Sequence, residues 1–119
     1  MGRTGAVDVE LLVVADCPNE SGAMSVLRLA CERAGMAALP VRTTVIASPE
    51  QAQKRGFVGS PTILIDGVDP LAIPGQRPAL ACRVYATEAG LSGVPPLAHV
   101  IAALTAARDQ ASARPNQPG

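Results

Sequence analysis

The sequence predicts an α/β fold in which a mixed four-stranded sheet is flanked by three helices. Two observations predict it. The hydrophobic pattern switches repeatedly between strand-like runs and helical spacing, which is typical of layered α/β domains. The chain has 119 residues, of which 48% are hydrophobic and 17% charged, enough for one core but too few for two domains. We expect one domain over residues 7–109, with flexible ends at residues 1–6 and 110–119.

The first strand and helix come early in the chain. Residues 7–15 (VDVELLVVA) begin by alternating and then become continuously apolar, which predicts a central strand that enters the core. The next segment predicts a helix of about four turns that ends at Gly35. Its apolar residues fall at helical spacing and are Met24, Leu27, Cys31 and Ala34.

A second strand and a short helix follow. Residues 40–46 (PVRTTVI) are rich in β-branched side chains and predict a strand. Ser48 is a typical N-cap, with Pro49 at the first helical position and Gln51 as the capping-box partner. Gly56 then ends this helix.

The last elements are two strands and one helix. Residues 58–65 predict a third strand with Pro61 at its first residue, the position where a strand tolerates proline. After an irregular, proline-rich stretch, residues 79–85 (ALACRVY) predict the fourth strand. Residues 96–108 predict an amphipathic helix.

Composition excludes several classes of function. Ten basic residues balance ten acidic ones, the basic residues do not cluster, and there are only one Phe, one Tyr and no Trp. Nucleic acid and membrane surfaces are therefore not expected partners. The first ten residues lack the apolar core of a signal peptide, so we expect a cytoplasmic protein. Zero net charge leaves a homodimer open.

The three cysteines, Cys17, Cys31 and Cys82, are too few for a disulfide framework and lack the close spacing of zinc ligands. No metal site is expected from them. Cys31 lies on the apolar side of its helix and is expected to be a packed core thiol. Cys82 is open to two interpretations, a buried structural thiol on the fourth strand or a redox group.

Cys17 is the best candidate for a reactive group. It follows the first strand and precedes Pro18, so we expect it at the N-cap of the helix, where the helix dipole favours thiolate over thiol. The carboxylates of Asp16 and Glu20 oppose this effect, and the direction of the net pKa shift is left open. Glu20 is expected to cap the backbone N–H of Cys17, with acid–base work as the alternative.

The order of elements, together with DCPN, VGSPTILIDG, LACRVY and GLSGVPP, resembles the DF family of small thioredoxin-like proteins, some of which carry selenocysteine. The resemblance covers roughly residues 8 to 104. It implies a thioredoxin-like fold, Cys17 as redox nucleophile and a cis bond between Ser60 and Pro61. Pro18, Ser60, Pro61 and Thr62 would form the substrate groove, in which the main chain of Ser60 offers hydrogen bonds to an extended substrate.

The chain departs from ordinary thioredoxins because Glu20 stands where the second cysteine would be. Cys31 lies fourteen residues further along the helix, about 21 Å away, whereas bridged Cα atoms lie within about 7 Å. A mixed disulfide on Cys17 must therefore be resolved by Cys82 or by an external thiol such as glutathione. No other cofactor is expected.

These observations predict a thiol-dependent redox protein that acts on protein or small-molecule thiols and disulfides, with Cys17 and Cys82 as its thiols. Two alternatives stay open. Cys17 and Cys82 could capture a soft metal or an organomercurial as thiolates, or the domain could be a redox-inactive interaction module. His99 is expected on the solvated face of the last helix, and Tyr85 in the packing with its hydroxyl bonded.

Overall fold

The computed structural model describes residues 7–113 and is built around one buried strand. Strand β1 (Val9–Val13) is buried along its whole length, as its apolar sequence predicts. It pairs in parallel with β2 (Val41–Val45) and antiparallel with β3 (Thr62–Ile65), which gives a mixed sheet of order β2-β1-β3. The predicted first three strands are confirmed, with shorter bounds.

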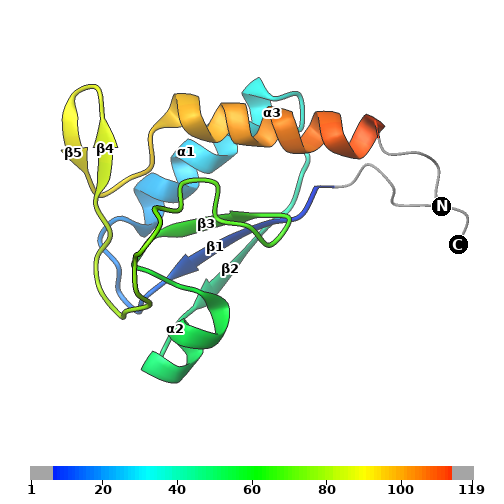
Figure 1. Ribbon diagram of the computed structural model, residues 1–119. Coiled ribbons are helices and arrows are strands. Elements are labelled where there is room, and N and C mark those ends of the chain that lie inside the picture. Colours follow the sequence, from blue (N-terminus) through cyan, green and yellow to red (C-terminus); the bar gives the residue numbers. More distant parts are fainter. Residues whose placement is uncertain (1–6, 114–119) are drawn as a thin grey trace, which may run out of the picture.

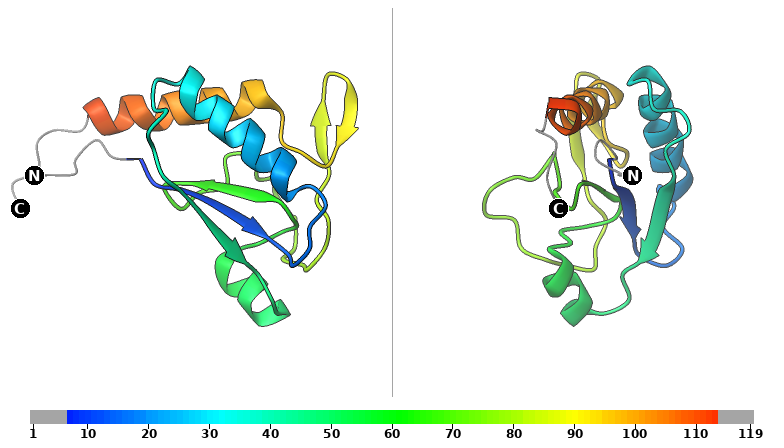
Figure 2. Two further views of the ribbon diagram at one scale, coloured as in Figure 1. Left: turned by 180° about the vertical axis from the view of Figure 1, so that it is seen from behind. Right: turned by 90° about the vertical axis from the view of Figure 1, so that its right-hand side faces the viewer.

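Helices cover both faces of this sheet. Helices α1 (Glu20–Arg33) and α3 (Leu97–Ala113) lie side by side on one face, and α2 (Pro49–Arg55) lies on the other (Figures 1 and 2). The side chains of β1 alternate between these layers. One core cluster includes Val9, Leu11 and Val13 together with residues of α1 and α3, and a second contains Leu12 and Phe57.

The short helix α2 follows its predicted capping chemistry. The backbone N–H of Gln51 donates to the Ser48 hydroxyl over 3.1 Å, and Pro49 is the first helical residue. The chain leaves the helix at Gly56 with a φ of 64°, a left-handed conformation that costs glycine little.

The predicted fourth strand does not join the main sheet. Residues 79–84 form no strand apart from an isolated bridge between Ser60 and Cys82, and β4 (Tyr85–Thr87) begins where the predicted strand ends. β4 pairs instead with β5 (Gly90–Ser92) in a hairpin that projects beside the start of α3 (Figure 1).

Helix α3 runs past its predicted end at Arg108 to Ala113. Residues 110–113 (QASA) contain no helix breaker, and the first proline comes at position 115, so the flexible tail predicted from residue 110 is partly helical. The rest of that tail, and the flexible end predicted at 1–6, lie outside the described residues. Between residues 7 and 113, no helix is both long and apolar enough to cross a membrane.

Candidate functional site

Ser60 joins three parts of the chain at the carboxyl end of β1. Its side-chain oxygen accepts a hydrogen bond from the backbone N–H of Val14 at 3.0 Å. Its own N–H donates to the carbonyl of Ala81 at 2.7 Å, and its carbonyl accepts from the N–H of Arg83 at 2.9 Å. The Ser60–Pro61 bond is cis, as the resemblance implied. Cys82 is therefore held opposite Ser60.

This arrangement overturns the expectation that Ser60 offers its main chain to a substrate. Both of its main-chain groups are already bonded to the segment that carries Cys82. Pro61 and Thr62 are fully buried as well, whereas Pro18, the fourth predicted groove residue, is exposed. The close approach depends on Gly59, where an added Cβ would lie 2.9 Å from the Cβ of Arg83.

Cys17 is not at the helix N-cap. The cap is Asn19 and α1 begins at Glu20, because Asp16 adopts a left-handed conformation (φ 58°) and the chain makes a further turn in which the N–H of Glu20 donates to the carbonyl of Cys17. Pro18 lies in this turn rather than in the first helical turn. Cys17 is 8% exposed and packs with the core cluster under α1 and α3.

The capping bond predicted for Glu20, one of the two carboxylates near Cys17, is not formed. Among the hydrogen bonds of the described residues, none joins the Glu20 side chain to the backbone N–H of Cys17. Glu20 is the first residue of α1, where its negative charge interacts favourably with the positive end of the helix dipole and stabilises the helix. Asp16 is exposed at the turn before Cys17.

The other two thiols have contrasting environments. Cys31 is 2% exposed in the core, as predicted, and burial raises the pKa of its thiol although the charge of Arg28 opposes this. Cys82 is exposed, which removes the interpretation of a buried structural thiol. Of the three thiols, only Cys82 is presented openly to solvent.

Arg83 and Tyr85 fix the segment around Cys82 on the protein. The Arg83 guanidinium is buried and donates to Thr62 Oγ1 at 3.1 Å, to Asp69 at 2.7 Å and to the carbonyl of Leu71 at 2.7 Å. It also lies over the ring of Tyr85, 4.5 Å from its centroid. Such a cation–aromatic contact adds to the hydrogen bonds when it is desolvated.

The Tyr85 hydroxyl donates to the carbonyl of Pro61, which confirms the prediction of a packed tyrosine with its hydroxyl bonded. Burial raises the pKa of this phenol well above its ordinary value, so it stays a hydrogen-bond donor at neutral pH.

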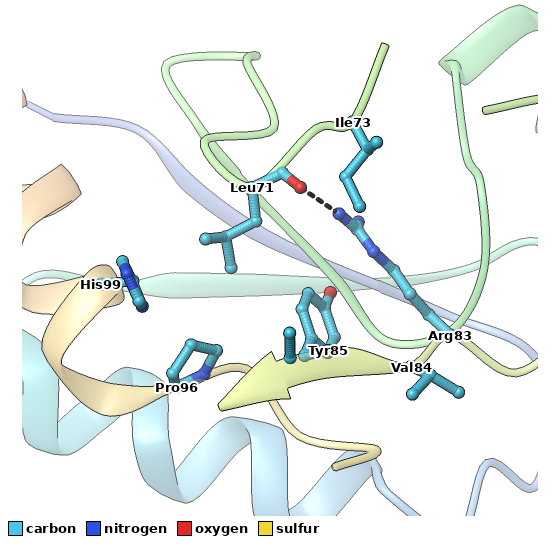
Figure 3. A pocket seen from close by; sticks show the side chains of 8 residues that line it. Leu71, Ile73, Arg83, Val84, Tyr85, Pro96 and His99 are labelled. Carbon is cyan, nitrogen blue, oxygen red and sulfur yellow. Dashed lines mark hydrogen bonds between the residues drawn. The ribbon is translucent and has the colours of Figure 1, made fainter. Parts of the chain in front are cut away.

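Two hollows flank this segment. One, of about 340 Å³, lies between Arg83, Tyr85 and the start of α3, where His99 is exposed as predicted (Figure 3). The other, of about 440 Å³, lies beside Cys82 at the carboxyl ends of β1 and β2. The exposed thiol therefore borders a surface depression.

Sequence reasoning missed the role of Arg83. The available signal was a single charged residue within the apolar run ALACRVY, which indicates a buried and paired charge if the run is buried. Within residues 7–113, no group of three or more His, Cys, Asp or Glu side chains is placed to hold a metal ion.

Comparisons with protein-family models, with curated proteins and with solved structures gave no match to this chain.

Proposed function

We propose that the protein is a thiol–disulfide exchange protein of thioredoxin-like fold whose two working thiols are Cys82 and Cys17. One observation carries the proposal: the hydrogen bonds of Ser60 hold the Cys82 segment against the carboxyl end of β1, from which Cys17 follows three residues after Val14. The order of β1, α1 and β2 and the cis Ser60–Pro61 bond before β3 support the fold assignment.

We infer the order of reaction from the difference in exposure of the two thiols, and this order reverses the roles expected from the sequence. Cys82 is open to solvent and meets the substrate first, whereas Cys17 is almost buried and acts second. Exchange requires a thiolate with access to the disulfide sulfur, so the more accessible thiol forms the mixed disulfide.

The proposed cycle has two exchange steps. The Cys82 thiolate attacks one sulfur of a substrate disulfide, a bond forms between Cys82 Sγ and that sulfur, and the other substrate sulfur leaves as a thiolate that takes a proton from water. The Cys17 thiolate then attacks Cys82 Sγ and releases the second substrate thiol. The substrate disulfide gains two electrons, and the protein dithiol is oxidised to a Cys17–Cys82 disulfide.

A small thiol such as glutathione resets the protein. Two molecules of the thiol reduce the Cys17–Cys82 bond in two further exchanges and become one molecule of disulfide. The external thiol thus supplies the electrons for the cycle. The sequence predicted glutathione instead as the alternative to Cys82 for resolving a mixed disulfide on Cys17.

The test is turnover of a peptide disulfide with glutathione as the reductant, measured for the wild type and three single variants. We expect Cys82→Ser to abolish turnover. Cys17→Ser, mixed with the peptide disulfide before glutathione is added, should stop after one mixed disulfide on Cys82, visible by mass spectrometry of the intact protein. Cys31→Ser is the matched control and should keep wild-type turnover. Undiminished turnover in Cys82→Ser would contradict the proposal.

A further inference from the structure

The hollow beside Cys82 is lined by aliphatic groups. It has a volume of about 440 Å³, within the range of small-ligand sites, and it lies where β1 and β2 end. Its lining consists of Val14, Ala15, Ile46, Ala47, Leu80, Ala81 and Cys82. Leu80 keeps 42% of its surface exposed, so the apolar character extends outward to the rim.

The electrostatics of this hollow disfavour a charged occupant. No charged side chain is among its lining residues, and the chain as a whole carries zero formal net charge. A charged group that entered it would lose hydration without gaining a partner, whereas an aliphatic group would leave water at no such cost. The thiol of Cys82 is the reactive group on this lining.

We propose that the hollow selects the thiol partner of Cys82: the partner sulfur carries an uncharged aliphatic group that enters the hollow while the sulfur bonds to Cys82. This inference rests on the proposed function, because it names the substrate class of the same site. A branched alkyl thiol and a cysteine followed by an aliphatic residue present the same chemistry to the hollow.

Alkyl methanethiosulfonates test this selectivity directly. The Cys82 thiolate attacks the sulfur that bears the alkyl group, a disulfide to Cys82 forms, and methanesulfinate leaves. We expect the isobutyl reagent to react with Cys82 about tenfold faster than the sulfonatoethyl and trimethylammonioethyl reagents, after each rate is divided by its rate with the urea-unfolded protein. Site-specific rates come from mass spectrometry of digests.

A charge placed in the hollow should remove the preference. Ala47 is exposed and lines the hollow, so Ala47→Asp should fold while disfavouring the isobutyl group. Ala89→Asp is the matched control, since Ala89 is exposed at the hairpin turn and is not part of the lining. We expect the tenfold preference over the trimethylammonioethyl reagent to persist in Ala89→Asp and to disappear in Ala47→Asp, because the new carboxylate attracts the cation.

Two activated peptide disulfides separate the possible sources of the aliphatic group. One carries a Cys-Val sequence and the other Cys-Asp. A preference for Cys-Val together with the isobutyl preference assigns a polypeptide partner, and an isobutyl preference alone assigns a small aliphatic thiol. Equal normalised rates for all reagents, or equal behaviour of the two alanine variants, would overturn the inference. Neither the reagent rates nor the peptide rates depend on Cys17. The selectivity inferred here and the turnover cycle of the proposed function can therefore fail independently of each other.

Discussion

Glu10 is a carboxylate that the fold buries on β1 and surrounds with donors. Its side chain is 7% exposed, and it accepts hydrogen bonds from Arg55 at 2.6 Å, from Arg42 at 3.3 Å and from Thr44 at 2.6 Å. Burial alone would raise the pKa of this carboxyl. The hydrogen bonds from Arg55 and Thr44 and the charges of the two arginines outweigh burial, and the pKa is lowered.

We expect Glu10→Gln to cost about 2 kcal/mol of folding stability at pH 7, because charge-assisted hydrogen bonds are replaced by neutral ones. The folded pKa lies below the ordinary value of 4.5, so the contribution is present above that pH and is lost as the pH falls through the folded pKa. Urea denaturation at pH 7 and pH 3 measures it. The difference from wild type should shrink in acid, unlike that of the exposed control Glu32→Gln, which should stay near zero at both pH values.

The thiols differ enough in exposure for their modification rates to separate. We expect Cys82 to react with iodoacetamide at least about tenfold faster than Cys17 or Cys31, because buried groups react only after local opening. Timed labelling followed by mass spectrometry of peptides gives the three rates. If the three thiols reacted at equal rates in the native protein, as they should in urea, the proposed order of reaction would be contradicted. A Cys17 that reacted first would contradict it as well.

At the level of elements, the stretch from Ala81 to Tyr85 is attached to the residues around the start of β3 by side chains as well as backbone. Arg83 bonds to Thr62 and to the 69–71 loop, and Tyr85 bonds to Pro61. Cys82 is thus exposed while both of its neighbours in the chain are held by hydrogen bonds. This attachment fixes the thiol in place without burying it.

Removing the Arg83 guanidinium should loosen this stretch. Arg83→Met leaves the Asp69 carboxylate, which is only 12% exposed, without its cation, and we expect a loss of about 3 kcal/mol in the free energy of unfolding. Hydrogen exchange of the backbone amides at positions 60 and 83 should accelerate as well. The control Arg77→Met removes an exposed arginine and should change neither quantity. Unchanged exchange at Ser60 in Arg83→Met would contradict the attachment.

Elements with local signals could be predicted from the sequence, and those set by distant contacts could not. The cap at Ser48, the apolar run of β1 and the stripe that buries Cys31 are encoded within a few residues. The position of Cys82 is fixed by a bridge to Ser60, 22 positions earlier, which no local pattern reveals. The start of α1 was misplaced because two successive turns after β1 compete with the predicted cap at Cys17.

At the scale of the whole molecule, the candidate site lies where the chain leaves β1 and enters β3. The mixed sheet supplies a rigid frame, with two helices on one face and one on the other (Figure 2). Cys17 belongs to the core on the side of α1 and α3, and Cys82 borders the hollow formed with the end of β2.

The most direct test of the account is the disulfide formed on mild oxidation of the monomeric protein. The Cys31→Ser variant, oxidised at low concentration and digested without reduction, should yield a peptide pair linked between Cys17 and Cys82, and reduction should release both peptides. Oxidised protein in which Cys17 remains a free thiol, with Cys82 bonded only to other chains or to added glutathione, would contradict the pairing of these two thiols.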